Sequence, residues 1–267
     1  MKKPLNLKAG DKVGLVCTAR AIMPEELDFA ITKLKSWGLV PVLGKTIGFR
    51  DHQYGGSDVE RIEDLQAMMD DVHIRAIVCA RGGYGTVRIL DHLDFEGFKQ
   101  NPKWVIGFSD ITALHFHIQQ HCDTMSLHAA MPSTYESSEL EAVEGIRNVL
   151  FWEEMEYEFA PHPFNRKGKA KGIVVGGNLS VLYSLMGSNS LPSFKGTILL
   201  LEDLDEYLYH VDRMMMNLKR AGVLSELAGL LVGGMTSMND NSIPFGKTAE
   251  GVIREHTAEY DLSLIHI

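Results

Sequence analysis

The sequence predicts an α/β protein in which helices cover both faces of a parallel sheet. Short apolar segments alternate along the chain with amphipathic helical patterns, and this order is typical of parallel sheets. The chain has 267 residues, of which 45% are hydrophobic and 23% charged, an ordinary composition for a protein with a buried core. A glycine-rich segment follows one of the apolar runs, at the edge where open α/β sheets bind ligands.

Four buried strands are predicted in the first half of the chain, at residues 12–18, 39–43, 74–80 and 104–108. Helices are predicted to follow them, at residues 24–37, 58–69, 87–92 and 109–120. Apolar side chains recur at about one helical turn after Pro24, and Gly38 ends that pattern.

Residues 151–170 interrupt this alternation, because they contain two prolines and mixed charge without a sustained period. They are predicted to be a linker between an N-terminal domain, residues 1–150, and a C-terminal domain, residues 171–267. In the second domain, apolar strand-like runs are predicted at 172–177, 197–201 and 227–232, with helices at 178–187 and 207–220.

Composition excludes several classes of function. A formal net charge of -9 argues against a nucleic-acid partner, which requires a basic surface. The three cysteines form no C-x-x-C pair, so neither a zinc ribbon nor a thioredoxin motif is predicted. The N-terminus lacks the features of a secretory signal, and no apolar run approaches the roughly 20 residues that span a bilayer. We expect a soluble cytoplasmic protein.

The first candidate for chemistry is Ser109, in the segment GFSD where a predicted strand passes into a helix. A sharp turn there exposes the serine hydroxyl above the sheet edge, as in a nucleophile elbow. The N–H of Asp110 would then face the same space and stabilise an oxyanion. The motif lacks its final glycine, and on spacing alone a simple helix cap is the more common role.

The second candidate is the segment RGGYG, residues 81–85, at the end of the third predicted strand. Its glycines allow close approach of the backbone to a ligand, and Arg81 could hold a carboxylate with two hydrogen bonds. A plain glycine-rich turn fits equally well. The segment matches neither nucleotide-binding fingerprint, which argues against a binder of NAD or ATP.

The third candidate is Glu202, which ends the apolar run GTILLLE. A carboxylate at the end of a buried strand requires a partner, and it could orient a histidine base. Asp203, Asp205 and Glu206 follow at once, so an acidic surface turn is the simpler interpretation.

Histidines recur on the helix predicted after Ser109, at positions 115, 117 and 121. His117 and His121 are spaced for a zinc pair, but no H-E-x-x-H motif or third ligand accompanies them. Packing or surface roles are therefore favoured, and no metal is expected. His128, after a probable strand, could line the cleft.

Six segments together resemble the LD-carboxypeptidase family of serine peptidases, also called the murein tetrapeptide carboxypeptidase family. They stand in the family's order and cover most of the chain: YGGSDVERIEDLQAMMDD, IRAIVCARGGYGTVRILDHLD, NPKWVIGFSDITALH, SLHAAM, VVGGNLSVLYSLMGS and ILLLEDLDEYLYHVDRMMMNLKRAG.

The resemblance implies a Ser–Glu–His arrangement. Ser109 would be the nucleophile and Glu202 the charge-relay residue. The N–H of Asp110 and one near Gly83 would form the oxyanion hole.

Substrate binding is expected of the same glycine-rich segment. Arg81 is our hypothesis for a cation that holds the substrate's free carboxylate, with Gly82 and Tyr84 beside it.

The resemblance also implies the reaction and the assembly. The family removes the terminal D-alanine from the L,D bond of muropeptide tetrapeptides in the cytoplasm, during cell-wall recycling. Its fold combines a flavodoxin-like N-terminal domain with a smaller C-terminal domain that has a β-rich core. A homodimer is expected, and no metal or organic cofactor.

One departure concerns the base. The family places its catalytic histidine in a Gly-His segment near the C-terminus, whereas this chain runs HTAEYD and then LSLIHI. His266 lies nearby but in a different local context. We expect a fragment that has a non-native tail after Asp261, lacks its base and is inactive or nearly so.

Two alternatives remain open. A microcin C immunity peptidase shares the Ser–Glu–His chemistry but acts on a nucleotide-like substrate; the short stretch between Met131 and Lys171 leaves little room for an added recognition loop. A protein that binds muropeptides without cleaving them is the second alternative, and the missing Gly-His segment is its only support.

Overall fold

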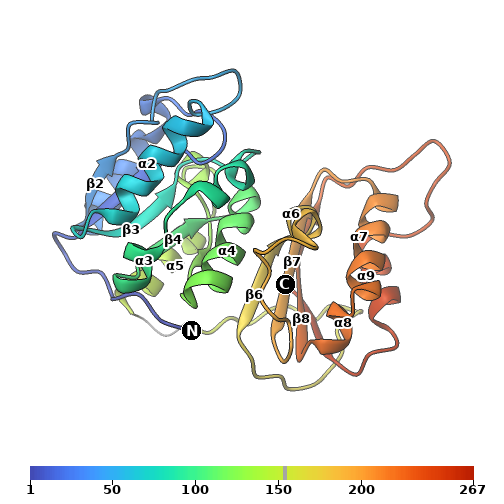
Figure 1. Cartoon of the computed structure of the whole chain (residues 1–267). Helices are drawn as coiled ribbons and strands as arrows, with labels where there is room; N and C mark the ends of the chain where they lie inside the picture. The colour runs from blue at the N-terminus through green and yellow to red at the C-terminus, as the bar shows by residue number, and fades with distance from the viewer. Residues whose placement is uncertain (153–154) are drawn as a thin grey trace. The chain divides into compact units, whose positions relative to one another are not determined.

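The computed structural model describes residues 1–152 and 155–267 (Figure 1). It divides into two compact units, Met1–Glu156 and Tyr157–Ile267. Each unit contains one parallel sheet with helices packed against it, which confirms the predicted fold class. Residues 157–170, part of the segment predicted to be a linker, lie in the second unit, where Arg166 forms a bridge with Leu264.

The sheet of the first unit has five strands in the order β2-β1-β3-β4-β5, all parallel. This is the flavodoxin-like order, in which the chain reverses its direction of winding between β1 and β3. The strands are β1 (Lys12–Val16), β2 (Val40–Leu43), β3 (Ile74–Cys79), β4 (Trp104–Gly107) and β5 (Leu127–His128).

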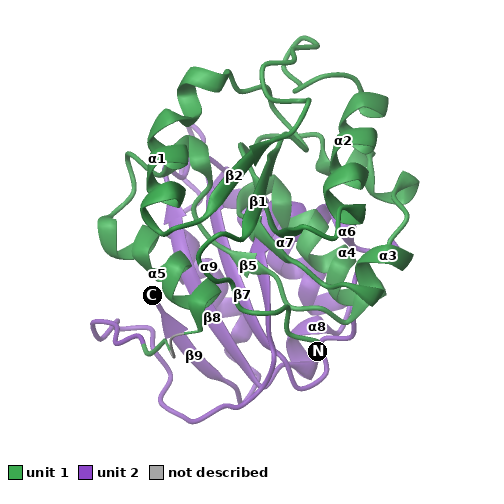
Figure 2. Cartoon of the chain, turned by 90° about the vertical axis from the view of Figure 1, so that its left-hand side faces the viewer, with its two compact units in different colours: residues 1–156 green, residues 157–267 purple. Residues whose placement is uncertain are grey.

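Among the described residues of this unit, five α-helices cover the sheet, with α1 and α5 on one face and α2, α3 and α4 on the other (Figure 2). They are α1 (Asp28–Ser36), α2 (Asp58–Asp70), α3 (Glu96–Gln100), α4 (Thr112–Cys122) and α5 (Leu140–Phe151). Short 3-10 turns join them: η1 (Pro24–Leu27), η2 (Thr86–Arg88), η3 (Leu90–His92), η4 (Ser109–Ile111) and η5 (Pro132–Thr134). Residues 87–92, predicted to form one helix, thus form parts of two separate 3-10 turns.

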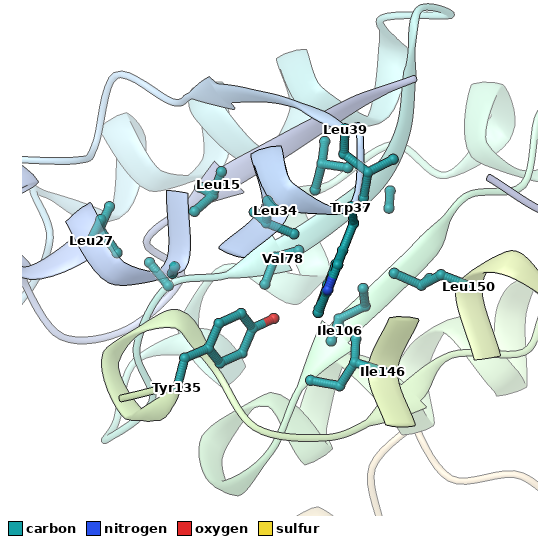
Figure 3. Close-up of a cluster of buried hydrophobic side chains, with 14 of the residues drawn as sticks. Leu15, Leu27, Leu34, Trp37, Leu39, Val78, Ile106, Tyr135, Ile146 and Leu150 are labelled. Atoms are coloured by element: carbon teal, nitrogen blue, oxygen red, sulfur yellow. The ribbon is translucent and has the colours of Figure 1, made fainter. Parts of the chain in front are cut away.

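A large hydrophobic cluster fixes α1 and α5 on the sheet (Figure 3). Trp37 from the end of α1 lies among Leu39, Ile106 and Leu150, all of them buried. These side chains come from segments far apart in the sequence, and their burial is the main free-energy gain that holds the layers together. The functional loops at the carboxyl edge of the sheet are therefore built on a rigid support.

The second unit has four parallel strands in the order β6-β7-β8-β9. They are β6 (Val174–Asn178), β7 (Ile198–Leu204), β8 (Gly229–Thr236) and β9 (Ser263–His266). The helices are α6 (Leu179–Leu185), α7 (Leu208–Arg220), α8 (Val223–Glu226) and α9 (Ala249–Thr257), and α7 packs against the other three. Alternate residues of β7 are buried, as expected for a strand with one face on a helical layer.

In the part of the chain that the structure describes, no helix has both the length and the apolar character needed to cross a lipid bilayer.

Candidate active site

Ser109 occupies a strained turn between β4 and the helical segment that leads into α4. Its φ is 58°, in the left-handed region that side chains other than glycine rarely adopt. Phe108 before it is extended, so the chain reverses sharply at the serine itself. Left-handed backbone at a non-glycine residue costs free energy, and it recurs at functional sites where the surrounding structure imposes it. We call residues 107–110 the serine elbow.

The geometry of the serine elbow does not fit a helix cap, the role that spacing alone favours for Ser109. A capping serine has extended dihedral angles, and its hydroxyl accepts a hydrogen bond from the first turn. At the start of η4 and of α4, the described residues form no side-chain capping bond, and Ile111 precedes α4. The structure therefore removes the simplest alternative to a chemical role.

The glycine-rich segment, residues 81–85, lies directly against the serine. A methyl group added at Gly82 would lie 3.3 Å from Cβ and 3.5 Å from Oγ of Ser109. The segment follows β3 and the serine follows the neighbouring strand β4, so both open on the carboxyl edge of the sheet. The two motifs predicted separately from the sequence are thus one site. We call residues 81–85 the glycine loop.

Asp110 ties the serine elbow to the far end of the glycine loop. Its buried carboxylate accepts a hydrogen bond of 2.8 Å from the N–H of Thr86. Burial raises the pKa of this carboxyl, and the bond from Thr86 opposes that rise. The side chain of Asp110 therefore has a structural role, which leaves its backbone N–H for the predicted oxyanion hole.

Arg61 anchors the glycine loop from the opposite side, a role that the sequence interpretation missed. Its side chain is completely buried and donates from Nη1 to the carbonyls of Thr18 and Gly85, and from Nη2 to Asp58. Gly85 has φ 144°, and a methyl group there would come within 2.7 Å of Nη1. The available signal was an arginine on the same helical stripe as Leu65, where an apolar residue is expected.

Arg81 lines a shallow hollow of about 360 Å³. Its Nη1 lies 3.2 Å from Oε1 of Glu26, so the cation already has a carboxylate partner. Arg20 and Arg50 line the same hollow. Gly83 and Tyr84 continue the glycine loop, and Tyr84 is exposed, with its ring 6.4 Å from that of Tyr54.

Glu202, the predicted charge-relay residue, lies in the second unit on β7, opposite Asn178 of β6. Burial raises the pKa of its carboxyl to about 7; the neighbouring Asp203 adds to the rise, and a hydrogen bond from the Asn178 side chain opposes it. A carboxyl held in this way changes its charge near neutral pH, a property typical of functional groups.

Asn178 and Asp203 form the support of Glu202, and neither was predicted as a site residue. The Asn178 amide donates to Asp203 at 2.9 Å, and Asp203 also accepts from the N–H of Ser180 and of Leu204. Asn178 itself caps α6 by accepting from Val181. The signal for this role was the Asn-x-Ser sequence at the end of an apolar run, which is typical of a helix start. The apparent acidic surface turn after Glu202 thus begins with a buried, fully engaged carboxylate.

His266, the only histidine considered in place of the missing Gly-His segment, has a different partner. The backbone N–H of His266 donates to Oδ1 of Asn165 at 2.8 Å, and the ring Nδ1 lies 3.0 Å from the same oxygen. Burial lowers the pKa of the ring, and the ring of His162 lies 4.2 Å away. A base in a serine triad donates from Nδ1 to a carboxylate. In the described structure, the Nδ1 of His266 faces an amide oxygen instead.

Of the other histidines of the sequence analysis, His115 and His117 are buried, His128 is half-buried and His121 is exposed. His115 is buried, contacts the Gly107 carbonyl through Nε2 at 2.9 Å, and lies 6.3 Å from His128. Burial lowers the pKa of both rings to about 4, which keeps them neutral at neutral pH. His117 is also buried, with the ring of His121 4.2 Å away. Among residues 1–152 and 155–267, no three His, Cys, Asp or Glu side chains are grouped to hold a metal ion.

A flavodoxin-like sheet with a strained serine at the end of one strand and a glycine loop beside it has the architecture of an α/β serine hydrolase. The family is established by two sequence models. The LD-carboxypeptidase N-terminal domain matches residues 13–129, and the LD-carboxypeptidase C-terminal domain matches residues 171–266. The chain belongs to the LD-carboxypeptidase family.

Curated relatives agree with this assignment. A probable murein peptide carboxypeptidase of Bacillus subtilis is 38% identical over 237 residues, which cover 86% of this chain and 74% of that protein. The murein tetrapeptide carboxypeptidase of Pseudomonas aeruginosa is 26% identical over 266 residues, covering 96% of this chain and 86% of its own. The predicted class of enzyme, a carboxypeptidase among the serine peptidases, is confirmed.

Solved structures share the fold. A muramoyltetrapeptide carboxypeptidase from Oxalobacter formigenes matches with a TM-score of 0.87 at 21% identity, covering 96% of this chain and 87% of its own. The microcin C7 self-immunity protein MccF in complex with aspartyl sulfamoyl adenosine also matches with a TM-score of 0.87, at 20% identity, covering 98% of this chain and 88% of its own. Equal similarity to both means that the fold alone does not choose between their substrates.

Proposed function

We propose that the chain is a serine carboxypeptidase that removes the terminal D-alanine from muropeptide tetrapeptides, with Ser109 as the nucleophile. The observation that carries this proposal is the left-handed backbone of Ser109 beside the glycine loop. The names of the relatives from Bacillus subtilis and Pseudomonas aeruginosa support a cell-wall peptide as the substrate.

The mechanism is acyl transfer. The Ser109 hydroxyl attacks the carbonyl of the third peptide residue, and its proton passes to a histidine base, for which His266 is the candidate that this chain offers. The tetrahedral oxyanion accepts hydrogen bonds from the N–H groups of Asp110 and of the glycine loop near Gly83. Collapse breaks the bond to D-alanine, whose amine receives the proton from the histidine. Water then attacks the acyl-enzyme, which releases the tripeptide and restores the serine.

Glu202 is proposed to orient the histidine and to stabilise its charged form. Its buried carboxyl and its support by Asn178 fit a group that must hold one geometry. The raised pKa of Glu202 implies that the relay is fully ionised only above neutral pH. Activity should therefore increase as the pH rises through about 7.

The first test is release of D-alanine from a muropeptide tetrapeptide by the wild-type chain and by Ser109→Ala. We expect the substitution to lower the rate at least a thousandfold, because the alanine methyl group cannot attack the carbonyl. Calorimetric affinity for the tetrapeptide should stay within about threefold, because the change removes one small polar group. Ser133→Ala, in the same unit, serves as a control. Turnover that survives in Ser109→Ala would refute the assignment.

A second candidate function is muropeptide binding without catalysis, and the placement of His266 favours it. This ring has the amide of Asn165 as its Nδ1 partner, not a carboxylate. Calorimetry and D-alanine release on the same sample separate the two functions. Binding without release supports the second, and release that is lost in Ser109→Ala supports the first.

The microcin-type alternative is separated by a parallel assay. We propose the cell-wall substrate because curated relatives with murein names match the chain at up to 38% identity, whereas the likeness to MccF is one of fold. A tetrapeptide and an aminoacyl-sulfamoyl adenosine should be compared at equal concentration. Preferential cleavage of the second would overturn the proposed substrate.

Assembly and location complete the proposal. The family resemblance supports a homodimer in the cytoplasm, with no nucleic-acid partner. Light scattering on the purified protein tests the dimer, since a mass near 30 kDa rather than near 60 kDa would contradict it. Fractionation of the producing cells tests the location.

A further inference from the structure

The hollow that contains Arg81 also contains two other arginines, and it lies where an α/β sheet of this order binds ligands. Its lining comes from residues 20–26 after β1, residues 50–53, and Arg81 after β3. The winding of the sheet reverses between β1 and β3, and the crevice outside their carboxyl ends is the usual ligand site of such sheets. We call this feature the arginine hollow.

The charges of the arginine hollow are not balanced. Arg20, Arg50 and Arg81 bring three cations into a protein whose net charge is -9, and Glu26 is the one acidic residue in the lining. Glu26 is paired with Arg81. Among the residues described by the structure, Arg20 and Arg50 have no carboxylate within 4.0 Å. Both side chains are exposed, so water screens their mutual repulsion, and an anion that enters the hollow would pair with them.

Arg20 connects the hollow to the proposed oxyanion hole. Its N–H donates to the Gly82 carbonyl, and its side chain covers Gly83, where a methyl group would come within 2.5 Å of Cδ. Gly83 has φ 115°, so two independent constraints keep this position a glycine. The charged side chain of Arg20 thus lies against the glycine loop, which is proposed to hold the scissile carbonyl.

We propose that Arg20 and Arg50 bind the C-terminal carboxylate of the residue that is removed, and that Arg20 thereby gives the enzyme its exopeptidase specificity. This inference rests on the proposed function. One residue spans about 3.5 Å of chain, so the carboxylate of a terminal residue lies one such step beyond the scissile carbonyl. The Arg20 side chain lies against the glycine loop, and so about one residue's length from the proposed position of the scissile carbonyl. Its planar guanidinium matches the geometry of a carboxylate. Arg81, which is paired with Glu26, forms part of the wall of the hollow.

The test is calorimetry with two peptides on the Ser109→Ala background, where turnover is blocked. The probes are L-Ala-γ-D-isoglutaminyl-L-Lys-D-Ala, whose only carboxylate is C-terminal, and the same peptide ending in D-alaninamide. We expect the acid to bind at least tenfold more tightly than the amide, the usual effect of a charge-assisted hydrogen bond. Arg20→Gln should remove this preference, and Arg20→Lys should keep part of it.

Arg75→Gln is the matched control, since Arg75 lies near the start of β3 at the opposite edge of the same sheet. This variant should retain the full preference for the acid. Equal binding of acid and amide, or a preference that survives Arg20→Gln, would overturn the inference and leave the proposed function standing. If neither peptide binds, the proposed function fails and the inference fails with it. Thermal melts of each variant identify a folding defect, and Arg50→Gln then provides a second test.

Discussion

Ser109 has a backbone conformation that is unfavourable for a residue other than glycine. A left-handed conformation costs an L-residue about 1 to 2 kcal/mol, whereas a glycine would adopt it freely. Five other non-glycine residues among those described also have positive φ, including Ser237, so the angle alone does not mark a functional residue. At Ser109 it coincides with the glycine loop lying against the hydroxyl, and the two observations together indicate a function that is independent of the family comparison.

The backbone cost can be measured by comparing Ser109→Gly with Ser109→Ala in urea unfolding. Both remove the hydroxyl, but only glycine relieves the left-handed strain, so the glycine variant should be more stable by about 1 kcal/mol. At Ser184, an exposed helical position in α6, the same pair should reverse in order, because glycine is the poorer helix former. An alanine variant at least as stable as the glycine variant at position 109 would show that the serine elbow is unstrained.

At Glu202 the free-energy cost comes from burying a charge, whereas at Ser109 it comes from the backbone conformation. Burial raises the pKa of its carboxyl from the ordinary 4.5 to about 7. An acid whose pKa rises on folding binds its proton more tightly in the folded state. The free energy of unfolding therefore decreases as the pH rises from about 4.5 to about 7, and stays at the lower value above that range.

Glu202→Gln should stabilise the protein at pH 8 by up to about 3 kcal/mol, since the neutral amide avoids burying a charge. The gain should shrink as the pH falls through 7 and vanish below pH 4.5, where the wild-type carboxyl is protonated in both states. Urea unfolding at four pH values between 5 and 8 measures this trend. Glu226→Gln, at an exposed position, should show no such pH-dependent gain. A gain independent of pH would contradict a raised pKa for Glu202.

At the scale of elements, the glycine loop is held from two sides rather than by its own sequence. Asp110 accepts from Thr86 at one end, and Arg61 donates to the Gly85 carbonyl from α2. The buried guanidinium also reaches Thr18 after β1, so one side chain joins two loops and a helix. Glycines give the loop its conformational freedom, and these two charged side chains remove most of it.

Arg61→Lys should destabilise the protein by about 1 to 3 kcal/mol, because an ammonium lacks the planar fork that places Nη1 on the two carbonyls and Nη2 on Asp58, and a buried acceptor then loses its bond. Hydrogen exchange should accelerate in residues 81–86. Arg88→Lys is the control: Arg88 also binds Asp58 but is exposed, so its loss should cost less than about 1 kcal/mol. Similar losses in the two variants would show that Arg61 does not anchor the loop.

At the scale of the whole molecule, each of the two parallel sheets carries part of the proposed catalytic residues. The first unit carries the serine elbow, the glycine loop and the arginine hollow on one sheet edge. The second carries Glu202 on a strand whose neighbour supplies Asn178. Parallel sheets align the ends of their strands, so residues distant in sequence meet without long loops. The chain has more acidic than basic residues, so the basic lining of the arginine hollow differs from the charge of the molecule as a whole.

The sequence predicted the main strands and long helices because their hydrophobic periods are strong, as in β3 and α2. It missed α5, which begins without a side-chain cap, as well as α3, α8 and α9, and it merged η2 and η3 into one helix. It also missed β9, which pairs with β8 in the segment expected to be a non-native tail. Such short 3-10 turns depend on the loops around them, here on the bond between Thr86 and Asp110. Local pattern carries no information about that contact.

The sequence by itself determined the family, the order of the elements and the identity of the candidate residues Ser109 and Glu202, because motifs and periodicity are local properties. Only the tertiary structure decided that Ser109 is strained rather than a cap, that Arg81 is already paired, and that Arg20 lies over Gly83. These are contacts and dihedral angles between segments up to some 60 residues apart, where packing and buried charge select one arrangement out of many.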